Sequence, residues 1–438
     1  MIAIVTRSIR AIALLPVAGF AAIAHSQAVY YPPAGNWEKR TPEQVGLTKR
    51  AVDSAVKIAI ASEPNSPKDL TANHMRTFGR EPYGEAIGPF RDRSAAGGLI
   101  IRKGYIVAEW GDPDRVETTN SVTKSFVTTT IGLAFDRKMI RDIKDPVRTY
   151  MAPVLALKGP PGNETPIAKV PPTSMSWTDS TNAQATRGRA YDAFEYLEPF
   201  ESAHNRKITW EHLLRQSSNW QGTLWGKPDW ADRFRLPANS TDTNAVINAQ
   251  RAEPGAEFDY NDVRVNLMAL SSLNIWRRPL PQVLKETVMD PIGASNTWRW
   301  HGYDNSWIVM DGQLVQSVSG GGHWGGGMII SARDMARFGY LTLRNGKWAG
   351  KQIVSEEWIK MSRTPGPANK TYGFANYYLN TLGDNGQRAL PSAPESAFFH
   401  LGAGSNIIYV DPVNDLVIMT RWTNNRAVDA MVKVLTGK

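Results

Sequence analysis

The segment from Ser121 to Ala134 constrains the fold more than any other part of this chain. Its surface is apolar apart from a lysine, Lys124, and a few serine and threonine hydroxyls. A helix of this composition is expected to be buried nearly all round, at the centre of a core. Lys124 then needs a partner or a cleft in the first turn of that helix, because an unpaired buried ammonium is costly.

Ser121 stands three residues before Lys124, so the hydroxyl and the ammonium share one helix face. At the first helical turn the Ser121 Oγ also lies near backbone N–H groups that a helix leaves unpaired, where developing negative charge is favoured. The pair is therefore a candidate nucleophile with its activator. The alternative is a helix-capping serine beside a solvated lysine.

A second pair with the same spacing, Ser54 and Lys57, serves as a comparison. It falls within a predicted helix over residues 49–61, whose apolar residues recur with helical spacing on one face. Ser54 and Lys57 lie on the opposite, solvated face of that pattern. The two serine–lysine pairs therefore differ in the helix that carries them. Lys124 is expected to be buried, and Lys57 is expected to be exposed to solvent.

Composition describes a globular chain of 438 residues with 42% apolar and 21% charged residues. The net charge of +9 is spread without a long run of like charges, which favours a solvated basic surface over a nucleic-acid site. The absence of cysteine excludes disulfides and thiolate metal sites. No two histidines have metal-site spacing, and the glycine-rich run 320–327 lacks the Lys-Ser/Thr of a phosphate loop, so we expect no cofactor.

The first 26 residues are typical of a signal peptide. Arg7 and Arg10 precede the apolar run 11–24, and small residues suited to cleavage follow, with cuts after Ser26 or Ala28 as the alternatives. The apolar run is too short to span a bilayer. We therefore expect an exported protein, periplasmic or secreted, without a stable membrane anchor.

Strand patterns gather near the two ends of the remaining chain. Residues 98–102 and 105–110 flank the turn Lys103-Gly104 as a hairpin, and strand-like runs cover 398–400, 406–410 and 416–420. The region between is rich in tryptophan and reads as helix or loop. This order predicts an α/β (α+β) fold with a sheet domain of residues 27–135 plus 320–438 and a mainly helical insertion of residues 136–319.

Two further motifs follow the first in chain order. Tyr260-Asn261-Asp262 comes after Pro254-Gly255 and before a helical run, and His400-Leu401-Gly402 lies on a predicted strand. Together with Ser121-x-x-Lys124 they resemble the three signatures of the serine β-lactamase and penicillin-binding-protein superfamily. The closer resemblance, over roughly residues 40–435, is to the class C β-lactamase branch with its family VIII esterases, D-aminopeptidases and 6-aminohexanoate-dimer hydrolases.

The resemblance implies a β-lactamase-like fold, an antiparallel-type sheet flanked by helices with an all-α region inserted and the active site between them. It implies Ser121 as the acylated nucleophile, with Lys124 and Tyr260 as its activating pair. Which of the two is the base stays open, because a Tyr base needs a cation to stabilise its phenolate. Backbone N–H groups of Ser121 and Ala403 would form the oxyanion hole.

Asp262, His400 and Gly402 are the implied substrate-binding residues, and two of them depart from the β-lactamase pattern. Asp262 stands where Asn is usual, and such a carboxylate would hold Lys124 charged and repel a substrate carboxylate. His400 stands where many β-lactamases and penicillin-binding proteins have a lysine, which binds the carboxylate of the β-lactam drug. Both changes favour an esterase or amidase acting on a small-molecule ester or linear amide.

Other interpretations remain for these residues. Tyr260 could be a core tyrosine, His400 a strand histidine, and His212, His301 and His323 structural or exposed. The protein could instead be a penicillin-binding or D-amino-acid peptidase-type cell-wall protein with little turnover, or an inactive relative used as a binding module. The sequence does not indicate an oligomeric state.

Overall fold

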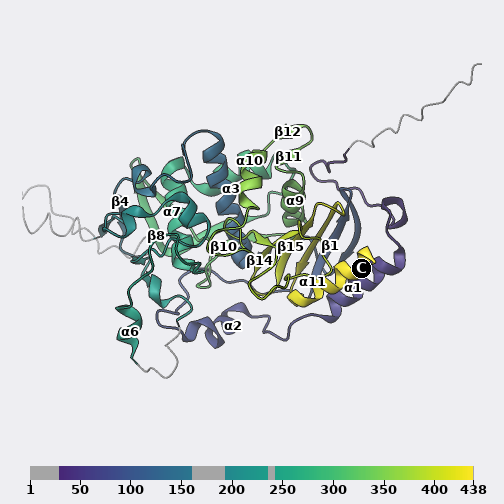
Figure 1. Cartoon of the computed structure of the whole chain (residues 1–438), viewed down its shortest axis with the longest axis horizontal. Helices are drawn as coiled ribbons and strands as arrows, with labels where there is room; N and C mark the ends of the chain where they lie inside the picture. The colour runs from purple at the N-terminus through teal and green to yellow at the C-terminus, as the bar shows by residue number, and fades with distance from the viewer. Residues whose placement is uncertain (1–28, 160–192, 235–241, 438) are drawn as a thin grey trace, which may run out of the picture.

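The computed structural model describes residues 29–159, 193–234 and 242–437, and the predicted signal peptide lies outside these residues. Two antiparallel sheets form the framework, with helices packed on and between them (Figure 1). The first sheet has six strands in the order β13-β14-β15-β16-β1-β2. These strands are β1 (Gly97–Arg102), β2 (Tyr105–Trp110), β13 (Tyr378–Leu379), β14 (Phe398–Gly402), β15 (Asn406–Asp411) and β16 (Leu416–Arg421). The predicted hairpin and strand-like runs are confirmed.

One face of this sheet is covered by the first and last helices of the described chain. α1 (Lys49–Ala61) and α11 (Asn425–Thr436) pack on each other and share a hydrophobic cluster with Ile100 of β1 and Ile418 of β16. Because side chains alternate along a strand, the neighbours of Ile100 and Ile418 point to the other face. The helix predicted over 49–61 is confirmed, and Lys57 is exposed on it.

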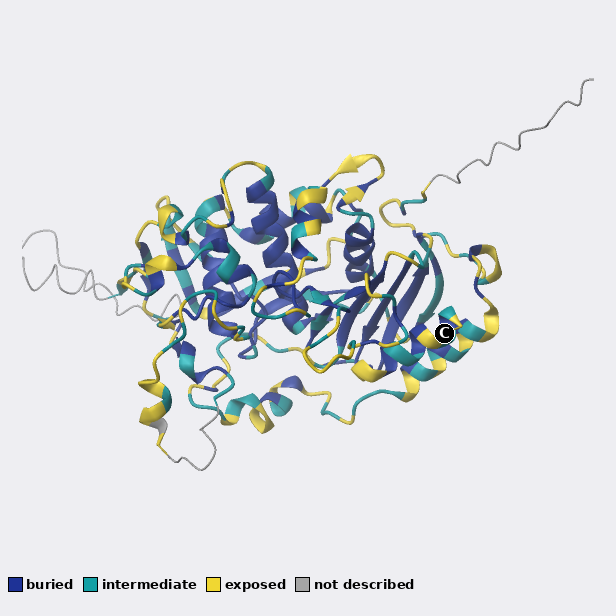
Figure 2. Cartoon of the chain, viewed as in Figure 1, coloured by how far each residue is buried: buried dark blue, intermediate teal, exposed yellow. Residues whose placement is uncertain are grey.

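The opposite face packs on α9 (Ala332–Leu343) and the larger core cluster. At the centre of that core lies α3 (Thr123–Asp136), in which every residue through Phe135 is buried (Figure 2). A short 3₁₀ turn, η3 (Asn120–Val122), leads directly into α3 and carries Ser121. The prediction of a helix buried nearly all round is confirmed.

A second sheet, with strand order β3-β10-β8-β4-β5 and with β9 paired to β8, includes most strands of region 136–319. Its strands are β3 (Glu117–Thr118), β4 (Val154–Leu157), β5 (Phe194–Leu197), β8 (Arg299–Met310), β9 (Gln313–Val318) and β10 (Gly327–Ile330). The expectation of a mainly helical insertion missed this sheet. An irregularity in the β8–β9 register between Gly302 and Trp307 breaks the period-two pattern that would have indicated the strands.

The helical run expected after Tyr260-Asn261-Asp262 is present as α7 (Asp262–Trp276). Asn261 caps this helix by accepting a hydrogen bond from the Arg264 backbone N–H. The remaining described elements are α2 (Leu70–Arg76), α5 (Trp210–Leu214), β6 (Thr223–Leu224), β7 (Lys227–Pro228), α6 (Thr243–Ile247), α8 (Leu280–Leu284), β11 (Lys347–Trp348), β12 (Lys351–Gln352), α10 (Glu356–Ser362), the π-helical turn η7 (Lys285–Met289), and 3₁₀ turns η1 (Glu43–Val45), η2 (Phe78–Arg80), η4 (Val147–Tyr150), η5 (Asn205–Lys207) and η6 (Asp229–Ala231). Among the described helices, none is long and apolar enough to cross a membrane.

Gly132 lets α10 approach the central helix closely, because a Cβ at this position would overlap the indole of Trp358. We predict that Gly132→Ala lowers the free energy of unfolding by about 1–3 kcal/mol through overpacking, despite the better helix propensity of alanine. Urea denaturation measures this change. Adding Trp358→Phe should recover part of the loss, and a fully additive double variant would contradict the packing explanation.

Candidate active site

The turn that carries Ser121 is strained and tied to the first sheet. Asn120 has a left-handed backbone with φ of 48°, and its Nδ2 donates a hydrogen bond of 2.8 Å to the Ala403 carbonyl, just beyond β14. Gly402 lies so close beneath this turn that a Cβ there would overlap the Thr119 carbonyl and lie 3.3 Å from the Ser121 backbone nitrogen. The N–H groups of Ser121 and Ala403 are thereby held in the same neighbourhood.

Lys124 is fully buried and has an acceptor for each of its three N–H donors. Its Nζ lies 2.8 Å from the Ser121 Oγ, 2.8 Å from Asp262 Oδ1 and 3.2 Å from the Gly321 carbonyl. An ammonium satisfied in this way can be buried at a tolerable cost. The partner that the sequence required for Lys124 is therefore the Asp262 carboxylate.

Asp262 lies at the start of α7 and has cations on both of its oxygens. While Oδ1 faces Lys124, Oδ2 accepts hydrogen bonds from Arg233 at 3.0 Å and from His323 Nδ1 at 2.9 Å. The Asp262 backbone N–H also donates to Asp232 at 2.6 Å. Asp262 is thus the junction between Lys124 and a group of charges behind it.

Burial and neighbouring charges act in opposite directions on this pair. Burial lowers the pKa of Lys124 below its ordinary value, although the charge and hydrogen bond of Asp262 oppose the shift. Burial would raise the pKa of Asp262, but Arg233 and Lys124, with His323, hold that pKa well below its usual range. Asp262 is therefore a carboxylate at neutral pH.

Tyr260 packs between two cations. Lys124 Nζ lies 5.0 Å and Arg233 Cζ 4.7 Å from the centre of its ring. Burial nevertheless raises the pKa of Tyr260, and the Asp262 charge raises it further, while Arg233 opposes the shift. Tyr260 is accordingly a neutral phenol at rest, although an interaction with the Ser121 hydroxyl favours its ionised form.

A cavity of about 390 Å³ opens onto Ser121. Its lining comes from the η3 turn, β13, the end of β14 and the residues after it, the start of α11, and the segments before α6 and α7. The lining residues are Ser121, Arg233, Tyr260, Tyr378, Leu401, Gly402, Ala403, Gly404, Ser405 and Asn425. The volume suits a small-molecule ligand.

A family model described as Beta-lactamase matches residues 87–432, most of the chain. The chain belongs to the β-lactamase family. It is a serine hydrolase of the β-lactamase fold, as the three motifs indicated. This range includes all three motifs and both sheets.

Solved structures of this fold resemble the chain at low identity. A family VIII carboxylesterase matches with a TM-score of 0.51 and 16% identity over 90% of this chain and 98% of that one. SurE with D-Leu matches with a TM-score of 0.50 and 13% identity over 89% and 76%. A 6-aminohexanoate-dimer hydrolase candidate from Bacillus anthracis matches with a TM-score of 0.49 and 15% identity over 93% and 88%. At such identities the first two of these matches support the β-lactamase fold alone.

The structure brings together most of the residues predicted for this family member. Ser121, Tyr260, Gly402 and Ala403 line the cavity, with Lys124 directly behind Ser121. Asp262 does not line the cavity, so its position suits holding Lys124 rather than touching substrate.

His400 is separated from the cavity. Its ring is fully buried, with Nδ1 2.9 Å from the Ser125 Oγ and 3.2 Å from the Asn376 carbonyl. Along β14 the side chain shares the buried face of Phe398, against Phe338 of α9. The implied substrate contact therefore does not fit this structure, and the ring packs beneath the central helix instead.

Three residues near the reaction centre were missed by sequence reasoning. Arg233 and Tyr378 line the cavity, and His323 bonds to Asp262. Arg233 stands in an irregular segment and Tyr378 in the two-residue strand β13, both far in sequence from the motifs, so no local pattern marked them. The glycines on both sides of His323, which let the chain turn tightly there, were the available signal.

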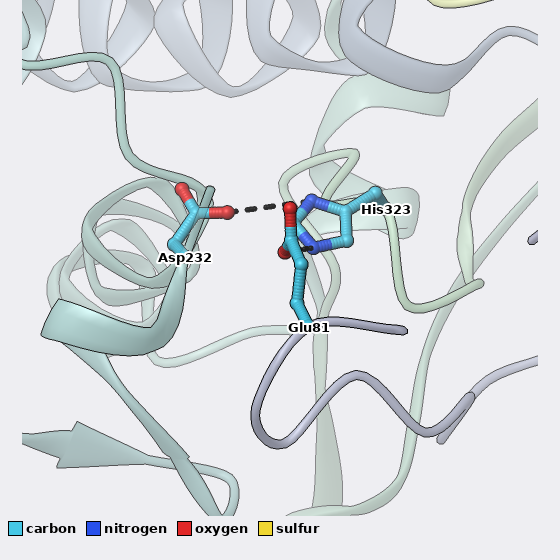
Figure 3. A group of neighbouring side chains, drawn as sticks. All are labelled: Glu81, Asp232 and His323. Carbon is cyan, nitrogen blue, oxygen red and sulfur yellow. Dashed lines mark ion pairs between the residues drawn. The ribbon is translucent and has the colours of Figure 1, made fainter. Parts of the chain in front are cut away.

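Two other histidines, His212 and His323, have defined surroundings in the structure. His212 completes a capping box with Thr209 at α5, a structural role. His323, expected to be structural or exposed, is nearly buried and lies with Glu81 and Asp232 in a group whose candidate ligand atoms are all within 4.8 Å of one another (Figure 3). The cavity-lining set within the described residues includes no tryptophan.

We predict that His400 makes the protein less stable in mild acid. Burial lowers the pKa of His400 in the folded protein to about 3. Between pH 6.5 and pH 3 this histidine is therefore protonated in the unfolded chain and neutral in the folded protein. Stability contributed by this group is present above pH 6.5 and is lost as pH falls. From pH 6.5 to pH 5 the free energy of unfolding should fall by about 2 kcal/mol more in the wild type than in His400→Gln. Urea denaturation at both pH values tests this, and equal losses in the two proteins would contradict it.

Proposed function

We propose that this protein hydrolyses a small ester or linear amide through an acyl-enzyme on Ser121. The observation that carries the proposal is the 2.8 Å contact between Lys124 Nζ and the Ser121 Oγ at the wall of the cavity. Serine is inert at its own pKa and needs a base within hydrogen-bond reach. Lys124 is in reach, and burial lowers its pKa toward the range of a working base.

In the acylation step the neutral Lys124 amine accepts the Ser121 proton as Oγ bonds to the carbonyl carbon of the substrate. The carbonyl electron pair moves to oxygen, where the backbone N–H groups of Ser121 and Ala403 stabilise the oxyanion. The tetrahedral intermediate collapses and the bond to the leaving group breaks. Tyr260, a phenol at rest, donates a proton to the leaving oxygen or nitrogen and regains one from Lys124.

Deacylation repeats these steps with water. The restored Lys124 amine takes a proton from water as the water oxygen attacks the acyl carbon. The tetrahedral intermediate again uses the two backbone donors, and Ser121 leaves with a proton returned from Lys124. Both half-reactions balance without a metal or cofactor.

Charge around the cavity favours a substrate without a carboxylate. Arg233 is the cation that lines the cavity among the described residues, and it pairs with Asp232 at 2.7 Å and Asp262 at 3.0 Å. A guanidinium neutralised by two carboxylates attracts a substrate anion weakly. Neutral esters and amides should therefore be preferred over β-lactams, whose carboxylate would lack a free partner.

We further propose that the protein is exported, which rests on residues 1–26 of the sequence. Mass spectrometry of the mature protein from its native compartment tests this. A chain that retains Met1 in the cytoplasm would contradict export.

Ser121 is the proposed nucleophile. Ser121→Ala should lose at least about 10³-fold in kcat/KM for a short-chain ester and should not be labelled by a fluorophosphonate, because the attacking oxygen is gone. Ser54→Ala, from the matched pair on α1, should keep both properties. Turnover and labelling retained by Ser121→Ala would refute the assignment. Covalent retention of a labelled penicillin without ester hydrolysis would instead favour the penicillin-binding alternative.

Asp262 should also influence whether the protein prefers neutral or anionic substrates. Asp262→Asn removes one of the two carboxylates that neutralise Arg233, so the guanidinium can attract a substrate carboxylate. The ratio of kcat/KM for a chromogenic cephalosporin to that for a neutral ester should rise several-fold. An unchanged ratio would remove Asp262 from the control of specificity.

A further inference from the structure

A buried group of charges lies behind Asp262, on the side away from Ser121. His323 lies in the glycine-rich segment that joins β9 to β10. Its Nδ1 is 2.9 Å from Asp262. The same atom is 3.3 Å from Asp232, and Nε2 is 3.2 Å from Glu81 (Figure 3). Both ring nitrogens of His323 thus face carboxylates.

An imidazolium presents an N–H to carboxylates at both ring nitrogens, through the hydrogen bond of Nδ1 to Asp262 and the ion-pair contact of Nε2 with Glu81. A neutral ring would turn a bare lone pair toward either Glu81 or the two aspartates. Burial lowers the pKa of His323, but hydrogen bonds to Asp262 and Glu81 outweigh this and raise the pKa above its ordinary value. The ring is also held in place between Phe78 and Trp324, with centroid distances of 4.3 and 4.2 Å.

The charges balance when His323 carries its proton and the three neighbouring carboxyl groups are ionised. The three carboxylates of Glu81, Asp232 and Asp262 then match the three cations of Lys124, Arg233 and His323. Without that proton one negative charge is left over in a buried site, which is costly. Burial, and then the nearby Asp262 charge, raise the pKa of Asp232 to about 6.

We propose that His323 is a positioning residue which, as an imidazolium, holds the Asp262 carboxylate and thereby sets how tightly Lys124 keeps its proton. This inference rests on the proposed function, in which Lys124 must release that proton to act as base. With His323 charged, Asp262 shares its negative charge among three cations. With a neutral residue at position 323, more of that charge acts on Lys124.

Other titratable groups face this part of the molecule and are further away. The His74 ring of α2 lies 6.5 Å from the His323 ring, and Lys227 lies 5.6 Å from the Trp324 ring and pairs with Glu85 at 2.8 Å. Neither contacts Asp262 in the structure. The direct route from His323 to Lys124 therefore passes through Asp262.

A metal ion is the other occupant that Glu81, Asp232 and His323 could accept. A divalent cation would have to displace the His323 proton and leave Nδ1 or Nε2 as a ligand. The balanced charges favour the proton, and metal content is accordingly one readout of the test.

The test compares the acid limb of kcat/KM for a neutral ester in three proteins. His323→Gln should move this limb about one pH unit upward, so that activity below the limb falls about tenfold, because Asp262 then holds the Lys124 proton more tightly. Asp262→Asn should move it downward, because the lysine loses its carboxylate. His204→Gln, a histidine remote from Asp262, should leave the limb in place. A merely structural role predicts lower activity at every pH without opposite shifts.

A second measurement needs no folded variant. In protein labelled with ¹⁵N-histidine, the His323 nitrogens should show the imidazolium chemical shifts at pH 7.5. A neutral ring at that pH, an unmoved or downward-shifted limb in His323→Gln, or a stoichiometric metal ion lost with His323 would each overturn the proposal. Loss of fluorophosphonate labelling in Ser121→Ala is independent of these results, so failure of the proposed function is recognised separately.

Discussion

The buried ion pair between Lys124 and Asp262 is the interaction on which the rest of the structure depends. Removing two charges from water costs several kcal/mol for each ion, and breaking one partner of such a pair costs about 3–5 kcal/mol. The pair is therefore a poor source of stability compared with apolar side chains of the same size. Its geometry matters more, because Lys124 contacts the Ser121 hydroxyl on one side and Asp262 on the other.

Several elements of the fold contribute residues around this ion pair. α3 supplies Ser121 and Lys124 from a helix that has no exposed side before its last turn, and α7 supplies Asp262 from a capped N-terminus. The end of β14 supplies the tight contact of Gly402 with the turn that carries Ser121, and the second sheet supplies the segment with His323. The site therefore forms where the two sheets meet, from residues distant in sequence.

The features that depend on a single segment of the chain could be predicted from the residue pattern within that segment. The burial of α3, the β1–β2 hairpin and the need of Lys124 for a partner all followed from spacing and composition. The positions of Arg233 and His323 did not, because their contacts to Asp262 cross between irregular segments that carry no periodicity. His400 was misplaced for another reason: strand alternation put it on the buried face with Phe398, while the motif suggested a role in the cavity. The second sheet was missed because of the irregular β8–β9 pairing.

The central claim is that Lys124, rather than Tyr260, takes the proton of Ser121. The most direct measurement is the rate of fluorophosphonate labelling of Ser121 as a function of pH in the wild type, Tyr260→Phe and Lys124→Met. The account predicts that Tyr260→Phe keeps an acid limb at nearly the wild-type pH, since the titrating lysine is still present, and that Lys124→Met loses labelling at every pH. Labelling that persists in Lys124→Met, with an acid limb that disappears in Tyr260→Phe, would contradict it.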